Sequence, residues 1–307
     1  DVRSLDLSHN LIAAVQAAPT GLGTFRFPWA LQNLNVSWNG LRRLNDALPL
    51  FLVQSDFSHN KLRNINLTLG NITVVARFRD VSVAYNLINA FEVQADGVYR
   101  LFQKINMSSN QLTAIPQFPK IANVVVDLSH NRISSTLDIS TVPRVLDLSH
   151  NNIRYFAASA SSSSDGFTYP PDALLLAHNL FMRNSSVALL SSRGVLPLTL
   201  DLSNNQIRGN LSMDAPQVDD DDGDAPTIQN LDLSGNSITG VDIHSNFNNA
   251  SSLVSLDLSN NCLTTFIAAN ATDSFLKLPS TINLSRNHLI AFSTSRENGL
   301  YIPSRTD

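Results

Sequence analysis

The chain is dominated by one short phrase that recurs along its whole length. Its clearest copies read LDLSHN (5–10 and 146–151), VDLSHN (126–131), LDLSGN (231–236) and LDLSNN (256–261). Alignment on the final Asn gives twelve copies, spaced 20 to 31 residues apart. The twelve positions are Asn10, Asn39, Asn60, Asn86, Asn110, Asn131, Asn151, Asn179, Asn205, Asn236, Asn261 and Asn287. A period of this size predicts a solenoid, in which each repeat stacks on its neighbours.

Apolar residues occupy fixed positions around this Asn. The residue three before it and the residue two after it are apolar in all twelve copies. The residue five before it is apolar in eleven, and Ser55 is the exception. Since side chains alternate across a strand, the apolar positions before the Asn point inward and their neighbours point outward. The pattern predicts one short parallel strand per copy.

This LxxLxLxxNxL pattern resembles the leucine-rich repeat family over nearly the whole chain, and Leu112-Thr-Ala-Ile-Pro116 resembles its plant-type LxxIP phrase. The resemblance implies an α/β-type solenoid of about 12 repeats with a parallel β-sheet on its concave face. We expect residues 1–307 to form a single solenoid without capping modules. Longer loops are expected at 157–171, which is Ser-rich, and at 214–226, which is Asp-rich.

The recurring Asn follows each expected strand, where the chain must turn sharply. A side-chain amide both donates and accepts hydrogen bonds, so it can satisfy backbone groups that the turn would otherwise bury without partners. We therefore predict that the twelve Asn form a structural ladder and bind no ligand.

An outward column between the two strand leucines is rich in carboxylates. Stacked carboxylates at strand spacing repel one another and favour a cation or a basic partner. This column is a candidate site for binding a basic ligand on the concave face. The alternative is a structural one, in which each Asp bonds nearby backbone. Its members are Asp6, Asp56, Asp127, Asp147, Asp201, Asp232 and Asp257.

Two further groups of residues suggest metal chemistry but have simpler explanations. Five histidines share the column immediately before the ladder Asn, namely His9, His59, His130, His150 and His178. Such a stripe suits metal binding or pH sensing, but a tolerant, exposed turn column is the better interpretation. The acidic run 219–222 with Asp224 lacks the alternating spacing of a calcium loop, so a solvated loop is the better interpretation. We expect no metal and no cofactor.

Sites for N-glycosylation are the third signal. The N-x-[ST] sequence occurs nine times against about four expected by chance, and none of the ladder Asn belongs to it. This partition is typical of a glycosylated extracellular protein. The nine are Asn35, Asn66, Asn71, Asn106, Asn184, Asn210, Asn249, Asn270 and Asn283. Three of them, Asn35, Asn106 and Asn283, fall in the outward strand column, where sugars would crowd the concave face.

Composition excludes several classes of protein. A net charge of −4 argues against a nucleic-acid binder. The most apolar run, 47–53, is far shorter than the ~20 residues of a membrane span. Cys262 is the single cysteine, so no intrachain disulfide forms, and we expect a partly buried thiol. The motifs GxSxG, HExxH, GxGxxG and GxxxxGK[ST] do not occur, which argues against an enzyme such as a hydrolase with paired aspartates.

The ends of the expected solenoid lack caps, so core side chains of the first and last repeats need a cover. Either the chain is an excerpt of a longer array, or copies stack head to tail. End-to-end copies would place 30 residues between Asn287 and the next Asn10, inside the observed range of spacings.

The sequence predicts a non-catalytic, glycosylated extracellular scaffold that binds protein partners, and head-to-tail assembly into a filament is one of the two explanations of its uncapped ends. The alternative is the ligand-binding ectodomain of a cell-surface receptor or adhesion protein. The expected partners are proteins, including copies of the chain, together with covalent N-glycans.

Overall fold

A computed structural model describes twelve stretches of the chain, one for each repeat. They are residues 2–13, 30–43, 52–66, 79–92, 103–116, 124–138, 143–157, 171–182, 197–213, 228–243, 253–268 and 279–293. The chain divides into two compact units. The first contains Asp1–Ser135 and Pro143–Leu148, and the second contains Thr136–Val142 and Ser149–Asp307.

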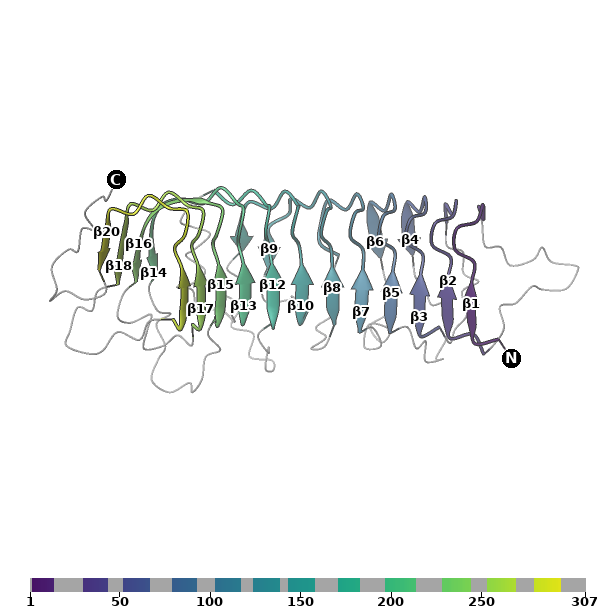
Figure 1. Cartoon of the computed structure of the whole chain (residues 1–307). Coiled ribbons are helices and arrows are strands. Elements are labelled where there is room, and N and C mark those ends of the chain that lie inside the picture. Colours follow the sequence, from purple (N-terminus) through teal and green to yellow (C-terminus); the bar gives the residue numbers. More distant parts are fainter. Residues whose placement is uncertain are drawn as a thin grey trace, which may run out of the picture. The chain divides into compact units, whose positions relative to one another are not determined.

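Short parallel strands form one face of each unit (Figure 1). In the first unit they follow one another in chain order: β1 (Ser4–Asp6), β2 (Asn33–Asn35), β3 (Gln54–Asp56), β5 (Asp80–Ser82), β7 (Lys104–Asn106), β8 (Val125–Asp127) and β10 (Val145–Asp147). In the second unit they are β12 (Ala173–Leu175), β13 (Thr199–Asp201), β15 (Asn230–Asp232), β17 (Ser255–Asp257) and β19 (Thr281–Asn283). We call this surface of each unit the sheet face. The expected solenoid of parallel strands is confirmed.

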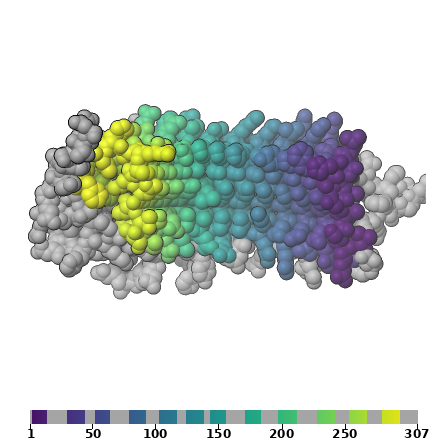
Figure 2. All heavy atoms as spheres, viewed as in Figure 1, coloured from purple at the N-terminus to yellow at the C-terminus, as the bar shows by residue number. Residues whose placement is uncertain are grey.

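The sheet-face strands pair without register shifts, so equivalent residues of successive repeats lie side by side. Leu5 is opposite Leu34, and Leu231 is opposite Leu256. Inward side chains are almost completely buried in the interior coils, as Leu34 (2% exposed) and Val36 (0%) show. Each such leucine or valine stabilises the fold by roughly 1.5–3 kcal/mol relative to an exposed one. Figure 2 shows side chains of neighbouring coils packed against one another within each unit.

A second layer of parallel strands follows the turns. The first unit contains β4 (Asn64–Asn66) paired with β6 (Ala90–Glu92). The second unit contains β9 (Leu137–Asp138) paired with β11 (Phe156–Ala157), and a sheet of β14 (Arg208–Met213), β16 (Ser237–Ile243), β18 (Thr265–Ala268) and β20 (Ala291–Ser293). Phe266 and Phe292 stack 5.5 Å apart in β18 and β20. None of the described residues is helical, so in these stretches the return path of the repeat is strand and loop.

The recurring Asn lies at the turn after each sheet strand and connects two coils. Asn60 is buried; its Nδ2 donates to Val36 O (3.0 Å) in the preceding coil and to Phe57 O and Ser58 O in its own. Its Oδ1 accepts from the backbone N of Leu41 at 2.9 Å. The same pattern recurs at Asn86, where Leu62 is the donor to Oδ1. Asn60 and Asn86 thus each make four hydrogen bonds to the backbone, whereas Asn10 in the first coil bonds only to Leu7 O and Ser8 O of its own coil.

Ser55 breaks the inward column and has a visible consequence. It is 5% exposed and lies between Leu34 and Val81 of the adjacent strands. Its Oγ makes no hydrogen bond. A buried hydroxyl without a partner costs about 1–3 kcal/mol, so this coil is a weak point of the first unit.

Candidate interaction surface

Polar side chains of the sheet face are held by a repeated turn. The outward Asp or Asn of the strand accepts a hydrogen bond through Oδ1 from the backbone N of the Ser two residues later. The bond measures 2.8 Å from Ser8 to Asp6 and 2.9 Å from Ser203 to Asp201. In several coils the Ser hydroxyl donates to the same oxygen, as from Ser129 to Asp127 at 2.7 Å.

The two positions of this turn change together along the chain. Ten coils have Asp or Asn in the outward column, and all ten have Ser two residues later. The other two coils have Ser82 and Leu175 in the column, and both have Ala two residues later, at Ala84 and Ala177. The Ser is therefore a partner of the carboxylate or amide. This coupling is visible in the sequence alone, and it supports the structural alternative for the Asp column.

The same turn explains three of the nine glycosylation sequences. Asn35, Asn106 and Asn283 occupy the outward column, and their Ser two residues later donates its backbone N–H to Oδ1 at 3.0 to 3.1 Å. Asn283 Nδ2 also donates to Asp257 Oδ2 at 2.9 Å. An N-x-S sequence at this place thus follows from the repeat itself, and it is weaker evidence for a sugar than a sequence elsewhere.

The other six glycosylation sequences lie off the sheet face or outside the described residues. Asn210 is in β14, exposed, and its amide lies over Gly240, where a Cβ would clash with it. Asn66 is in β4. Four more lie outside the described residues: Asn71, Asn184, Asn249 and Asn270.

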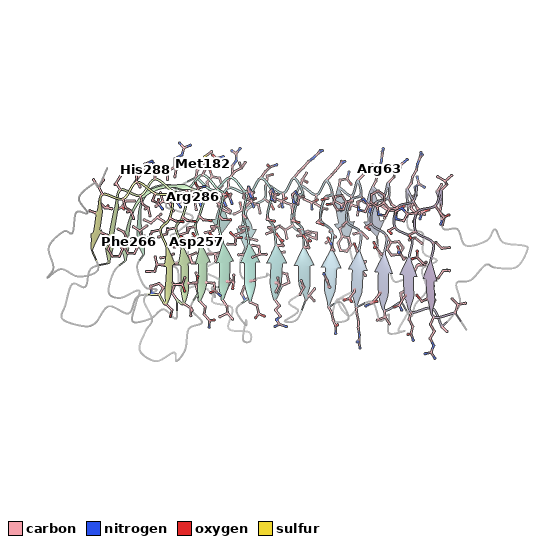
Figure 3. All side chains as sticks on the ribbon, viewed as in Figure 1. Arg63, Met182, Asp257, Phe266, Arg286 and His288 are labelled. Atoms are coloured by element: carbon pink, nitrogen blue, oxygen red, sulfur yellow. The ribbon has the colours of Figure 1, made fainter. Side chains whose placement is uncertain are left out.

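Three carboxylates stand side by side on the sheet face of the second unit. Asp232 of β15 is opposite Asp201 of β13 and Asp257 of β17. Burial raises the pKa of Asp232, and the charges of Asp201 and Asp257 raise it further against the hydrogen bonds from Ser234. For Asp257, burial raises the pKa, but the hydrogen bonds from Ser259 and Asn283 together outweigh it and the net pKa is lowered. Asp257 is marked in Figure 3.

The first unit holds isolated carboxylates around a shallow groove. The groove has a volume of about 420 Å³ and crosses β1, β2, β3, β5 and β7. Asp6, Asp56 and Asp80 line it with one cation, Lys104. Backbone and side-chain hydrogen bonds from Ser8 lower the pKa of Asp6. The groove is polar, open and net negative, which favours a basic or amide-rich peptide segment over a small apolar ligand.

The column before the ladder Asn has a left-handed backbone at every coil. Its φ is 52–55° at eleven non-glycine residues and 65° at Gly235. The backbone N of this residue donates to the next coil, as from His59 to Ala84 O at 3.0 Å. His150 and His178 stack with centroids 4.2 Å apart. Among the described residues, no three His, Cys, Asp or Glu side chains cluster in a way that suits a metal ion.

Three remaining expectations concern single features. Cys262 is exposed, so the expectation of a partly buried thiol is wrong: the residue directly after the ladder Asn points outward from the turn. The acidic run 219–224, the loop at 214–226 and residues 158–170 of the Ser-rich loop lie outside the described residues. In the described part of the chain, no helix has the length and apolarity of a membrane span.

Comparison with known proteins identifies the family. Residues 227–249 and 252–271 match the family model described as Leucine Rich Repeat. Tsukushi of Rattus norvegicus is 26% identical over 210 residues, which cover 66% of this chain and 58% of Tsukushi. Leucine-rich repeats and immunoglobulin-like domains protein 2 of Mus musculus is 29% identical over 120 residues, covering 32% of this chain and 11% of that protein.

The fold agrees with a solved structure of the same kind. The crystal structure of the leucine-rich repeat domain of APL1B superposes with a TM-score of 0.55 at 19% identity, covering 93% of this chain and 83% of that one. The chain is a leucine-rich repeat protein. It spans just under three fifths of the length of rat Tsukushi. Arrays of this family present extended surfaces for binding other proteins.

Neutralising the central carboxylate of the second unit tests the electrostatics of the sheet face. Because the pKa of Asp232 is raised in the folded state, the folded protein holds this proton more tightly than the unfolded chain does. The stability of the fold therefore falls as the pH rises from the unfolded pKa of Asp232 through its folded pKa. Asp232→Asn should therefore stabilise the protein at pH 7 by about 0.5 kcal/mol after solvent screening. The gain should vanish below the ordinary Asp pKa of 3.8. Urea midpoints at neutral and acid pH, with protein made in bacteria to avoid a new sugar, measure it.

Asp257→Asn is the matched control, since its pKa is shifted in the opposite direction. Its new amide would face the Nδ2 of Asn283, so this variant should lose stability at pH 7. Equal effects of the two substitutions would contradict the assigned charge pattern.

Proposed function

We propose that the chain is a non-catalytic, glycosylated extracellular scaffold that binds protein partners through its sheet face. The observation that carries this is the polar groove of the first unit, lined by Asp6, Asp56 and Asp80 on strands in fixed register. Rigid strands present these groups without an ordering cost on binding. The relatives Tsukushi and the mouse immunoglobulin-like repeat protein are secreted or cell-surface proteins, which supports the location.

The alternative is the ligand-binding ectodomain of a receptor or adhesion protein. The sheet face serves both proposals equally. The flanking gene sequence separates them: a membrane-spanning helix and cytoplasmic tail favour the receptor, and a coding region without them favours the scaffold.

Basic peptides should bind the groove better than neutral or acidic peptides of matched length. Asp56→Asn removes one charge and keeps the turn, because Asn35 and Asn106 accept the same hydrogen bond in their coils. We expect it to weaken binding of a Lys/Arg-rich peptide by about 0.5–1 kcal/mol, roughly two- to fivefold. Peptide arrays followed by titration of bacterially made protein measure this.

Asp201→Asn is the matched control for Asp56→Asn, since it changes an equivalent turn in the other unit and lies outside the groove. It should leave binding unchanged. Acidic peptides that bind as well as basic ones would refute the proposed groove specificity.

The glycans should be concentrated on the sequences outside the outward strand column. We expect sugar on Asn66, Asn71, Asn184, Asn210, Asn249 and Asn270, low occupancy on Asn35, Asn106 and Asn283, and none on the ladder. A sugar on Asn283 would replace its Nδ2 hydrogen bond to Asp257. Glycopeptide mass spectrometry of protein from its native source measures occupancy at each site. Bare sequences throughout would contradict the extracellular location.

Head-to-tail stacking is a second candidate function, favoured by the exposure of the outermost coils. Leu5, Leu7, Ile282 and Leu284 are half-buried, whereas the equivalent leucines of interior coils are buried. Among the described strands, β1 pairs only with β2 and β19 only with β17. A second copy would supply the missing strand and apolar contacts at each edge, and such a heterologous contact does not close.

Sedimentation velocity over a concentration series tests the stacking. The 307-residue chain should give a sedimentation coefficient that rises with concentration. Leu284→Asp should abolish the rise, while Thr281→Asp on the outward side of the same strand should retain most of it. Monomer at every concentration would contradict the proposal.

A further inference from the structure

The turns that follow the sheet strands form a surface of opposite charge to the sheet face. We call the turns of the first unit the turn ridge, and it comprises residues 8–13, 37–43, 58–63, 84–89, 108–113 and 129–134. These six segments contain five Lys or Arg and no Asp or Glu, although the whole chain has a net charge of −4. The sheet face of the same unit carries Asp6, Asp56, Asp80, Asp127 and Asp147.

Four of the five cations belong to two adjacent coils. Arg42 and Arg43 follow Asn39, and Lys61 and Arg63 flank Leu62 in the next coil; all four are exposed. Two hydrogen bonds join the coils that carry these cations. The backbone N of Lys61 donates to Leu41 O at 2.8 Å, and the backbone N of Leu41 donates to the side-chain Oδ1 of Asn60. Figure 3 marks Arg63 at the margin formed by the turns, away from the strands of the sheet face. Like charges held this close repel one another, and an anion lowers that energy.

An aromatic stack runs beside these cations. Ring centroids are 5.4 Å apart for His9 and Trp38, 3.8 Å for Trp38 and His59, and 4.3 Å for His59 and Tyr85, with planes within 10° of parallel. Trp38 and Tyr85 remain half exposed. Since the ring faces cover one another, the stack presents ring edges with N–H and O–H groups. Those edges donate hydrogen bonds, and the ring faces covered inside the stack are closed to nucleobases.

We propose that the turn ridge of the first unit binds a linear anionic polysaccharide. Its cations are concentrated on two adjacent coils and its ring-edge donors recur at the spacing of the coils, which suits a polymer that carries several sulfate or carboxylate groups. The covered ring faces disfavour single-stranded nucleic acid. The acidic sheet face repels the polysaccharide and confines it to the ridge.

The test uses heparin as the probe and a charge-matched control. The ridge variant combines Arg42→Gln, Lys61→Gln and Arg63→Gln. The control combines Arg3→Gln, Arg79→Gln and Lys104→Gln, three exposed cations outside the ridge. We expect the ridge variant to weaken heparin binding about tenfold or more near ~0.1 M salt and to reduce the slope of log K against log salt by about 2 to 3. The control should keep nearly wild-type affinity and slope.

Two comparisons distinguish the occupants. Polyadenylate and polyglutamate of similar charge should bind at least several-fold more weakly than heparin, and neutral dextran should not bind. If both triple variants lost heparin affinity equally, heparin would be responding to the net charge of the protein and not to the ridge. That result would overturn the proposal. Polyadenylate or polyglutamate binding as tightly as heparin would also overturn it. Thermal unfolding of each variant shows that the fold is intact.

Discussion

The structure depends on one interaction, the bond between an Asn side chain and the backbone of two coils. At Asn110 the Nδ2 donates to Val83 O in the preceding coil and to Met107 O and Ser108 O in its own, all at 3.0 Å. The Oδ1 accepts from Ile88 N at 3.0 Å. A sharp turn after every strand would otherwise bury these groups without partners, at a cost of about 1–3 kcal/mol each. The amide therefore allows the chain to turn next to the core.

The alignment of successive turns determines the charge of the sheet face and of the turn ridge. Because each coil is fixed to the next in register, a side chain at one position of the repeat becomes a column. The outward strand column holds Asp or Asn bonded to Ser, and it makes the sheet face acidic. The Lys and Arg residues that follow the ladder Asn make the turn ridge of the first unit basic. A chain with only 15% charged residues thus acquires two surfaces of opposite sign.

The spacing of the repeats in the sequence predicts the strands and the inward leucines. It does not predict features that depend on backbone geometry. The left-handed backbone at Trp38 and Tyr85 is such a feature, because bulky residues adopt it only where the turn imposes it. The second layer of strands lies where repeat length varies, so no column marks it. The exposure of Cys262 and the role of Asn283 in a strand turn are apparent only in the folded structure.

Hydrogen exchange of backbone amides tests the ladder most directly. The N–H groups of Leu62, Ile88 and Leu112 donate to ladder side chains and not to another backbone. If the ladder holds the coils together, these amides exchange as slowly as those of the sheet strands, and Asn110→Ala accelerates exchange at Ile88 far more than at Leu41. Rapid exchange at all three amides in the wild-type protein would contradict this account.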